Sequence, residues 1–122
     1  MNLLIGESQS FLAESYYEKL TNLGHQVAVC KEGKECIDKY QESLKESLFG
    51  NNSLDIVIVD EELINNGLET IDEILSINPK QKVLFITNHK SMFAPKTSNI
   101  SIIEKPFTMC GMIQQLDELE TE

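Results

Sequence analysis

The chain has 122 residues, the length of one domain, because two halves of this size would each lack a sufficient core. Hydrophobic residues make up 41% and charged residues 25% of the sequence, which is typical of a folded protein and excludes general disorder. The formal net charge of -10 disfavours nucleic-acid and anionic lipid partners, and it favours a basic partner or a bound cation. We therefore expect residues 1–122 to form a single domain with no nucleic-acid and no membrane partner.

The three cysteines are Cys30, Cys36 and Cys110. Their spacing fits neither a zinc site nor a C-x-x-C motif, and an odd number does not build a disulfide framework, so we expect reduced thiols. No apolar run is long enough to span a bilayer, and the first residues lack the charged and apolar regions of a signal peptide. These features predict a cytoplasmic protein.

Five short, mostly apolar runs, each bounded by turn residues, predict β-strands. They lie at residues 3–5, 26–30, 54–59, 83–86 and 100–103. The third run is nearly all apolar and rich in β-branched residues, which is typical of a strand with both faces buried.

The first two predicted helices follow the first and second strands. The first begins after Ser8 or Ser10, either of which can cap it, and ends before Gly24, which suits the position after a helix. The second follows Gly33 and ends at the breaker cluster of residues 50–53. The apolar residues at helical spacing are Phe11, Leu12, Tyr16, Leu20 and Leu23 in the first helix, and Ile37, Tyr40, Leu44 and Leu48 in the second.

The other two predicted helices follow the turn at residues 65–67 and Pro106. The earlier of them ends at Asn78, because the residue before a proline avoids the helical conformation. Segment 88–99 is polar and is broken by Pro95, so it has room for at most a turn or two of helix. The apolar residues at helical spacing are Leu68, Ile71, Ile74 and Leu75, and then Met109, Met112, Ile113, Leu116 and Leu119.

Strands and helices alternate along the chain, which predicts an α/β domain with a parallel sheet and helices on both faces. Right-handed crossovers between parallel strands restrict the topology to a few choices. In open sheets of this class the ligand site lies outside the carboxyl ends of the strands, and the chemistry is expected there.

Four polar side chains stand at or just after the predicted strand ends: Glu7, Asp60, Thr87 and Lys105. Neighbouring carboxylates repel, so a cation among them is physically sensible, and oxygen ligands with several waters suit Mg²⁺. A carboxylate that attacks phosphorus needs its charge, and that of the transferring group, neutralised by a metal and a lysine. A threonine hydroxyl can donate a hydrogen bond to a phosphoryl oxygen. The set fits phosphoryl transfer to Asp60.

Five short stretches carry a resemblance to a known family. They are residues 3–8 (LLIGES), 56–60 (IVIVD), 67–69 (GLE), 84–87 (LFIT) and 105–108 (KPFT). In this order, with polar residues at strand ends, the chain resembles the response-regulator receiver family, the CheY-like superfamily, over nearly its whole length. The resemblance implies a doubly wound, five-stranded parallel sheet of the flavodoxin-like strand order 2-1-3-4-5, with a shortened or missing fourth helix.

By this resemblance, Asp60 accepts a phosphoryl group from the phosphohistidine of a sensor histidine kinase or a phosphotransfer protein. Mg²⁺ is held by Glu7, Asp60 and the backbone carbonyl of Glu62. Thr87 is the switch residue that binds the phosphoryl group, and Lys105 pairs with it. The implied function is that of a stand-alone response regulator in two-component phosphorelay signal transduction, which switches binding to an unidentified downstream protein. Such a phosphoprotein is not an enzyme, beyond slow self-phosphorylation and autodephosphorylation of its aspartyl phosphate.

The sequence departs from the family pattern at several points. Ser8 follows Glu7 where the family usually carries two adjacent acids, so we expect weak Mg²⁺ binding. The loop after Asp60 lacks the usual proline, and Ile102 stands where the family often has a tyrosine or phenylalanine that swings inward on activation. Segment 88–99 is too short for the usual fourth helix, and the second helical region is longer than usual. The family's common output face is therefore altered here.

Each site residue also has a purely structural interpretation. Asp60 could cap a turn, Lys105 could be a solvated lysine, and Thr87 could be an ordinary strand former. Ser8 fits a helix cap better than a metal ligand, and His89 is expected on the rim of the site. The alternative function is a phosphorylation-independent pseudo-receiver that acts as a protein-interaction module. A small phosphatase fits less well, because no separate base or substrate pocket can be assigned.

Overall fold

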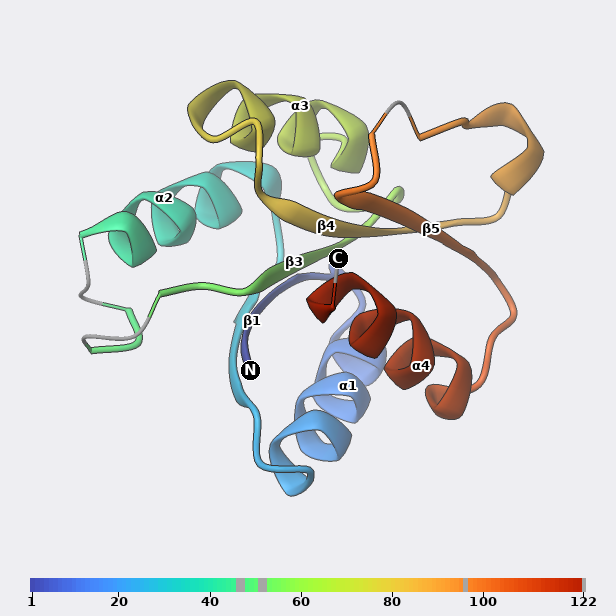
Figure 1. The fold of residues 1–122 in the computed structure, drawn as a ribbon, viewed down its shortest axis with the longest axis horizontal. Coiled ribbons are helices and arrows are strands. Elements are labelled where there is room, and N and C mark those ends of the chain that lie inside the picture. Colours follow the sequence, from blue (N-terminus) through green and yellow to red (C-terminus); the bar gives the residue numbers. More distant parts are fainter. Residues whose placement is uncertain (46–47, 51–52, 96, 122) are drawn as a thin grey trace.

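The computed structural model describes residues 1–45, 48–50, 53–95 and 97–121. Five strands form one parallel sheet in the order β2-β1-β3-β4-β5 (Figure 1). They are β1 (Asn2–Gly6), β2 (Gln26–Cys30), β3 (Ile56–Asp60), β4 (Lys82–Thr87) and β5 (Ile100–Glu104). The predicted flavodoxin-like strand order is confirmed.

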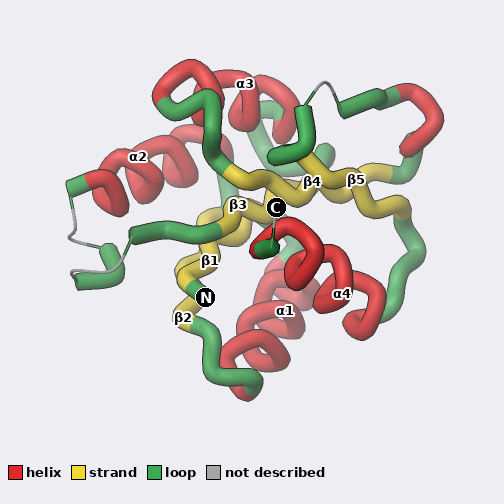
Figure 2. Tube along the Cα trace, in the orientation of Figure 1, coloured by secondary structure: helices red, strands yellow, loops and turns green. Residues whose placement is uncertain are grey.

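Helices cover both faces of the sheet (Figure 1). Helices α1 (Ser10–Asn22) and α4 (Met109–Glu120) lie on one face, and α2 (Gly33–Leu44) and α3 (Gly67–Ile77) lie on the other. Between β4 and β5, the described residues contain a single short 3-10 turn, η1 (Lys90–Met92), in place of a longer helix (Figure 2). The prediction of a shortened or missing fourth helix is therefore confirmed.

Strand β3 has both faces buried, which explains its uniformly apolar sequence. Ile56 and Ile58 pack into the core beneath α1 and α4, whereas Val57 and Val59 pack into the core beneath α2 and α3. Side chains alternate between the two faces of a strand, so each layer of helices receives every second residue. The last residue of the strand, Asp60, is also fully buried.

The first residues of α3 pack directly against the backbone at the end of β3. Asn66 has a positive φ of 70° and caps the helix, because its side-chain oxygen accepts hydrogen bonds from the backbone N–H groups of Leu68 and Glu69. At Gly67, a Cβ atom would overlap the backbone carbonyl oxygen of Asp60. The predicted turn is confirmed, and glycine is required there because the helix touches the chain at Asp60.

Phe93 covers part of the sheet surface that a helix between β4 and β5 would otherwise cover. The ring of Phe93 packs edge-on against Phe85 of β4, with centroids 5.2 Å apart and an interplanar angle of 83°. Ile102 of β5 is 8% exposed and belongs to the same core cluster. A short segment with one well-placed aromatic residue therefore covers the sheet at this point.

Some predicted boundaries were wrong. Strand β3 begins at Ile56 and not at residue 54, and α2 ends at Leu44, so Leu48 lies in a bend beyond the helix. The breaker residues 51–52 and Lys96 of the predicted loop lie outside the described residues. Among the described helices, none combines the length and the apolar character needed to cross a membrane.

The buried face of α1 also differs from the predicted one. Ala13, Tyr16 and Leu20 are buried, as their spacing of three and four residues requires for one helix face. Phe11 is 81% exposed and Leu23 is 56% exposed, although both were expected in the core. Phe11 is two residues from Ala13, a spacing that places it on another side of the helix, and Leu23 lies past the helix end.

The structure contains a disulfide bond between Cys30 and Cys36, where the sequence predicted reduced thiols. Cys30 ends β2 and Cys36 lies in the first turn of α2, so their Cα atoms are 5.2 Å apart and both side chains are fully buried. The prediction was wrong because counting and spacing cannot show that a helix folds back over the end of the preceding strand. Cys110 is an exposed free thiol.

Candidate functional site

Four polar side chains meet at the carboxyl edge of the sheet, as predicted. Asp60 is the last residue of β3 and Thr87 is the last residue of β4. Glu7 follows β1 directly, and Lys105 follows β5 directly. Because the strands are parallel and β1 and β4 flank β3, these ends lie at one edge of the sheet.

Asp60 and Lys105 form a buried ion pair. The Lys105 Nζ atom lies 2.6 Å from Asp60 Oδ2, and the Asp60 side chain is completely buried. The other carboxylate oxygen, Oδ1, accepts a hydrogen bond from the backbone N–H of Glu62 at 2.8 Å. Burial alone would lower the pKa of Lys105, but the hydrogen bond and charge of Asp60, together with the charge of Glu7, raise it above its ordinary value. Lys105 therefore stays positively charged, which a buried carboxylate requires.

Glu7 is a second buried carboxyl group beside this pair. Its Oε2 atom accepts a hydrogen bond from the backbone N–H of Gln9 at 3.1 Å, while its Oε1 atom has no hydrogen-bond partner among the described residues. Burial, followed by the neighbouring Asp60, raises the pKa of Glu7 from 4.5 to about 7. Below that pH, Glu7 is neutral and Lys105 balances Asp60; once Glu7 ionises, two carboxylates face one lysine and the site lacks one positive charge.

The carboxylates of Glu7 and Asp60 fit a magnesium ion. An orphaned, buried carboxylate oxygen is the kind of donor that a hard cation takes, and Mg²⁺ keeps several waters in place of further protein ligands. No group of three or more His, Cys, Asp or Glu side chains within the described ranges is arranged to hold a metal. The protein side chains therefore offer a sparse ligand set.

The hydroxyl of Thr87 contacts Glu61, a residue that was not predicted to belong to the site. Thr87 Oγ1 donates a hydrogen bond to Glu61 Oε1 at 2.5 Å and accepts one from the backbone N–H of His89 at 2.9 Å. The Nδ1 atom of His89 lies 3.6 Å from the same Glu61 oxygen, on the exposed rim as expected. The one available signal was the pair of acids directly after Asp60 in the sequence.

Ser8 joins two loops of the site. Its hydroxyl donates a hydrogen bond to the backbone carbonyl of Lys31 at 2.7 Å and accepts one from the backbone N–H of Ile64, also at 2.7 Å. The loop that follows Asp60 is held further by a bond from Gly33 N to the Ile64 carbonyl. The predicted helix cap was wrong at both serines, because Gln9 is the N-cap residue of α1 and no side chain caps it.

Solved structures that resemble this fold include response-regulator receiver domains. A response regulator receiver domain protein from Clostridium thermocellum gives a TM-score of 0.79 at 19% identity, over 98% of this chain and 94% of that chain. TrrA, a response regulator from Thermotoga maritima solved in complex with Mg(2+)-BeF, gives 0.76 at 21% identity, over 97% of each chain. The chain has the response-regulator receiver fold. The chemotaxis response regulator CheY4 of Vibrio cholerae, with a TM-score of 0.76 at 17% identity over 97% of each chain, has the same fold.

No protein-family model and no curated protein matches this chain in sequence. The structural likeness establishes its fold, and the roles of its residues must be argued from their own geometry. Ile102 stands where the family resemblance leads one to expect an aromatic residue. It packs in the core cluster that contains Phe85 and that Phe93 packs against, and its aliphatic side chain covers the sheet there.

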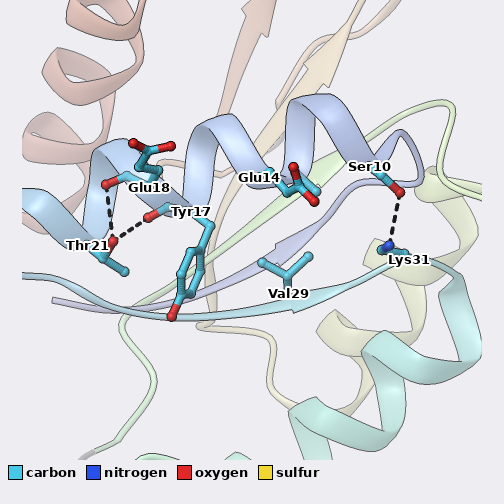
Figure 3. Close-up of a pocket in the computed structure, with 8 residues that line it drawn as sticks. Ser10, Glu14, Tyr17, Glu18, Thr21, Val29 and Lys31 are labelled. Atoms are coloured by element: carbon cyan, nitrogen blue, oxygen red, sulfur yellow. Dashed lines mark hydrogen bonds between the residues drawn. The ribbon is translucent and has the colours of Figure 1, made fainter.

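Several grooves mark the surface of the protein. One, of about 580 Å³, lies between α1 and β2, where Figure 3 shows the Tyr17 ring extending from α1 toward β2, and Lys31 donating a hydrogen bond to Ser10. None of the four strand-end residues lines it. A second groove of about 490 Å³ lies between α1 and the start of α4, and Lys105 is part of its wall. This second groove borders the polar site.

Proposed function

We propose that the chain is a response-regulator receiver that accepts a phosphoryl group on Asp60, and that residues 1–122 form one receiver-like domain. The observation that carries this proposal is the fully buried Asp60 carboxylate, paired at 2.6 Å with Lys105 and flanked by the second carboxyl group of Glu7. Burying this charge costs free energy. A role as phosphoryl acceptor, at the carboxyl edge of an α/β sheet where ligands bind, explains why the protein has a buried carboxylate here.

The transfer step follows from the charges of the site. An Asp60 carboxylate oxygen attacks the phosphorus of a phosphohistidine, the phosphorus–nitrogen bond breaks, and the histidine nitrogen leaves with the bonding electrons and takes up a proton. Lys105 offsets the negative charge that gathers on the phosphoryl oxygens. Thr87, at the end of the neighbouring strand, is the proposed hydrogen-bond donor to one of those oxygens.

Magnesium is the proposed cofactor, with Glu7, Asp60 and the backbone carbonyl of Glu62 as its ligands. When bound, it supplies positive charge next to the transferring group. The structure of TrrA in complex with Mg(2+)-BeF supports this use of the fold. Binding should be weak in this receiver, because Ser8 is committed to its two loop contacts and Glu7 holds a proton up to a pH of about 7.

The proposed donor is a sensor histidine kinase or a phosphotransfer protein, and the proposed target is a downstream protein that distinguishes the two states of the receiver. A net charge of -10 favours a basic surface on either partner. We place the protein in the cytoplasm, where such donors act, and expect no more enzymatic activity than slow self-phosphorylation and autodephosphorylation.

Incubation with acetyl phosphate and Mg²⁺, followed by intact-mass measurement, tests the proposal. The mass should rise by one phosphoryl group in the wild type and stay unchanged in Asp60→Asn. Asp55→Asn is the matched control, because Asp55 lies before the other end of β3, where it accepts a hydrogen bond from the backbone N–H of Asn2. Equal labelling of the Asp60 variant would overturn the site assignment, and a folded wild type that never labels would favour the phosphorylation-independent interaction module.

A further inference from the structure

The single hydroxyl proton of Thr87 is already in use in the unmodified protein. Thr87 is 1% exposed, and its Oγ1 atom donates to Glu61 Oε1 at 2.5 Å while accepting from His89 N at 2.9 Å. A hydroxyl donates one hydrogen bond, so Thr87 cannot donate to a phosphoryl oxygen and to Glu61 at the same time. Any switch that uses Thr87 must first break its bond to Glu61.

We propose that Glu61 is a positioning residue that holds Thr87 in the unmodified state and competes with the phosphoryl group for the Thr87 proton. This inference rests on the proposed function, in which Asp60 is phosphorylated and Thr87 binds the phosphoryl group. We call the hydrogen bond between Thr87 Oγ1 and Glu61 Oε1 the latch. A hydrogen bond to an ionised carboxylate is about twice as strong as one between neutral groups, so the latch favours the unmodified arrangement.

The geometry allows Glu61 to release without disturbing the sheet. Its backbone N–H stays bonded to the Ile86 carbonyl at 2.8 Å, whereas its side chain is 30% exposed and can turn toward water. Glu61 directly follows Asp60, so added phosphoryl charge on Asp60 repels the Glu61 carboxylate. The modification therefore weakens the latch and offers Thr87 a new acceptor in one event.

The latch also joins the two loops that border the site. Asn88 Nδ2 donates to Glu62 Oε1 at 2.9 Å, next to the contacts that Thr87 and His89 make with Glu61. The chain directly after β4 is thus held to the chain directly after β3 through two neighbouring acids. Of these contacts, the one made by Thr87 involves a buried side chain. Its loss on release of Thr87 loosens the segment that leads to η1.

Beryllofluoride binding, followed by fluorine NMR in the presence of Mg²⁺, measures the competition directly. Glu61→Gln should bind beryllofluoride about tenfold more tightly than the wild type, because it exchanges a charged acceptor for a neutral one. Glu104→Gln is the charge-matched control: Glu104 pairs with Thr87 in the β4–β5 register, but its exposed carboxylate accepts from Lys90 N at 3.2 Å, whereas the Thr87 hydroxyl donates to Glu61. This variant should bind like the wild type, within about twofold.

A double-mutant cycle with Thr87→Val separates the latch from simple charge repulsion. If Glu61 acts through Thr87, the gain from Glu61→Gln disappears in the Thr87→Val background. An equal gain in both backgrounds, or no gain in the wild-type background, overturns the latch while leaving the proposed function intact. A wild type that binds no beryllofluoride overturns the proposed function, and the latch as a switch falls with it.

A measurement on the unmodified protein tests the resting contact independently of any phosphoryl mimic. Glu61→Ala should free the Thr87 side chain, so three-bond couplings should show averaging of its χ1 rotamers, and the His89 amide should exchange its hydrogen faster. An unchanged Thr87 rotamer and unchanged His89 exchange would show that Glu61 does not hold Thr87.

Discussion

Glu7 should make the metal-free protein lose stability as the pH rises. Its pKa increases from 4.5 in the unfolded chain to about 7 in the folded protein, mainly through burial and then through Asp60. The folded state therefore binds the proton more tightly, and this contribution is fully present below pH 4.5 and is lost as the pH rises through about 7. The shift corresponds to about 3 kcal/mol of unfolding free energy.

The change Glu7→Gln isolates this effect, because it keeps the shape of the side chain and cannot ionise. In urea denaturation with a metal chelator present, the variant should be more stable than the wild type at pH 8 by up to about 3 kcal/mol, and nearly equal to it at pH 4.5. Burial lowers the pKa of His25, so its protonation affects the stability in the opposite direction. Its contribution cancels when the two proteins are compared at each pH.

Magnesium should reduce this difference at high pH. The cation and the proton compete for the Glu7 carboxylate, so Mg²⁺ should stabilise the wild type more at pH 8 than at pH 5. Glu7→Gln should lose most of this stabilisation. Parallel pH profiles for the two metal-free proteins would refute the assignment of a buried, proton-holding Glu7, and equal stabilisation by Mg²⁺ would refute its role as a ligand.

Three further changes test the packing around the site. Gly67→Ala should destabilise the protein by roughly 3 kcal/mol in urea denaturation, because the added methyl group has no space against the backbone of β3, and a cost below about 1 kcal/mol would contradict that contact. Under denaturing conditions without reductant, alkylation should label Cys110 alone, and reduction of Cys30–Cys36 should then cost about 2 kcal/mol; three labelled thiols would show that the disulfide does not form. Ser8→Asp should raise Mg²⁺ affinity in titration calorimetry by adding an acid, and it should lower the melting temperature because the donor to a backbone carbonyl is lost; unchanged values of both would refute the role given to the serine.

The sheet and the strand-end residues were predictable because they depend on local pattern and on a general rule of topology. The apolar run of β3 identified a doubly buried strand, and the carboxyl ends of parallel strands placed Asp60 beside residues that are distant in the sequence. The pairing of Asp60 with Lys105 followed from the need to neutralise a buried charge.

Other features depend on packing that periodicity does not encode. The rotamer of Thr87, and so its bond to Glu61, is set by neighbours from two loops. The helical spacing in α1 fitted two overlapping apolar faces, and contact with the sheet selected the one that leaves Phe11 exposed. The disulfide could be recognised only once α2 was folded back over β2.

Chemical trapping of the modified residue tests the central claim most directly. The protein is incubated with acetyl phosphate and Mg²⁺ and then treated with borohydride, which reduces an acyl phosphate to an alcohol and so converts phosphoaspartate to homoserine. Peptide mass spectrometry should find homoserine at position 60, and no reduced side chain (5-hydroxynorvaline) at the adjacent acids Glu61 and Glu62. Reduction at another residue, or a chain that stays unmodified while it remains folded with Mg²⁺, would contradict the assignment of Asp60 as the phosphoacceptor.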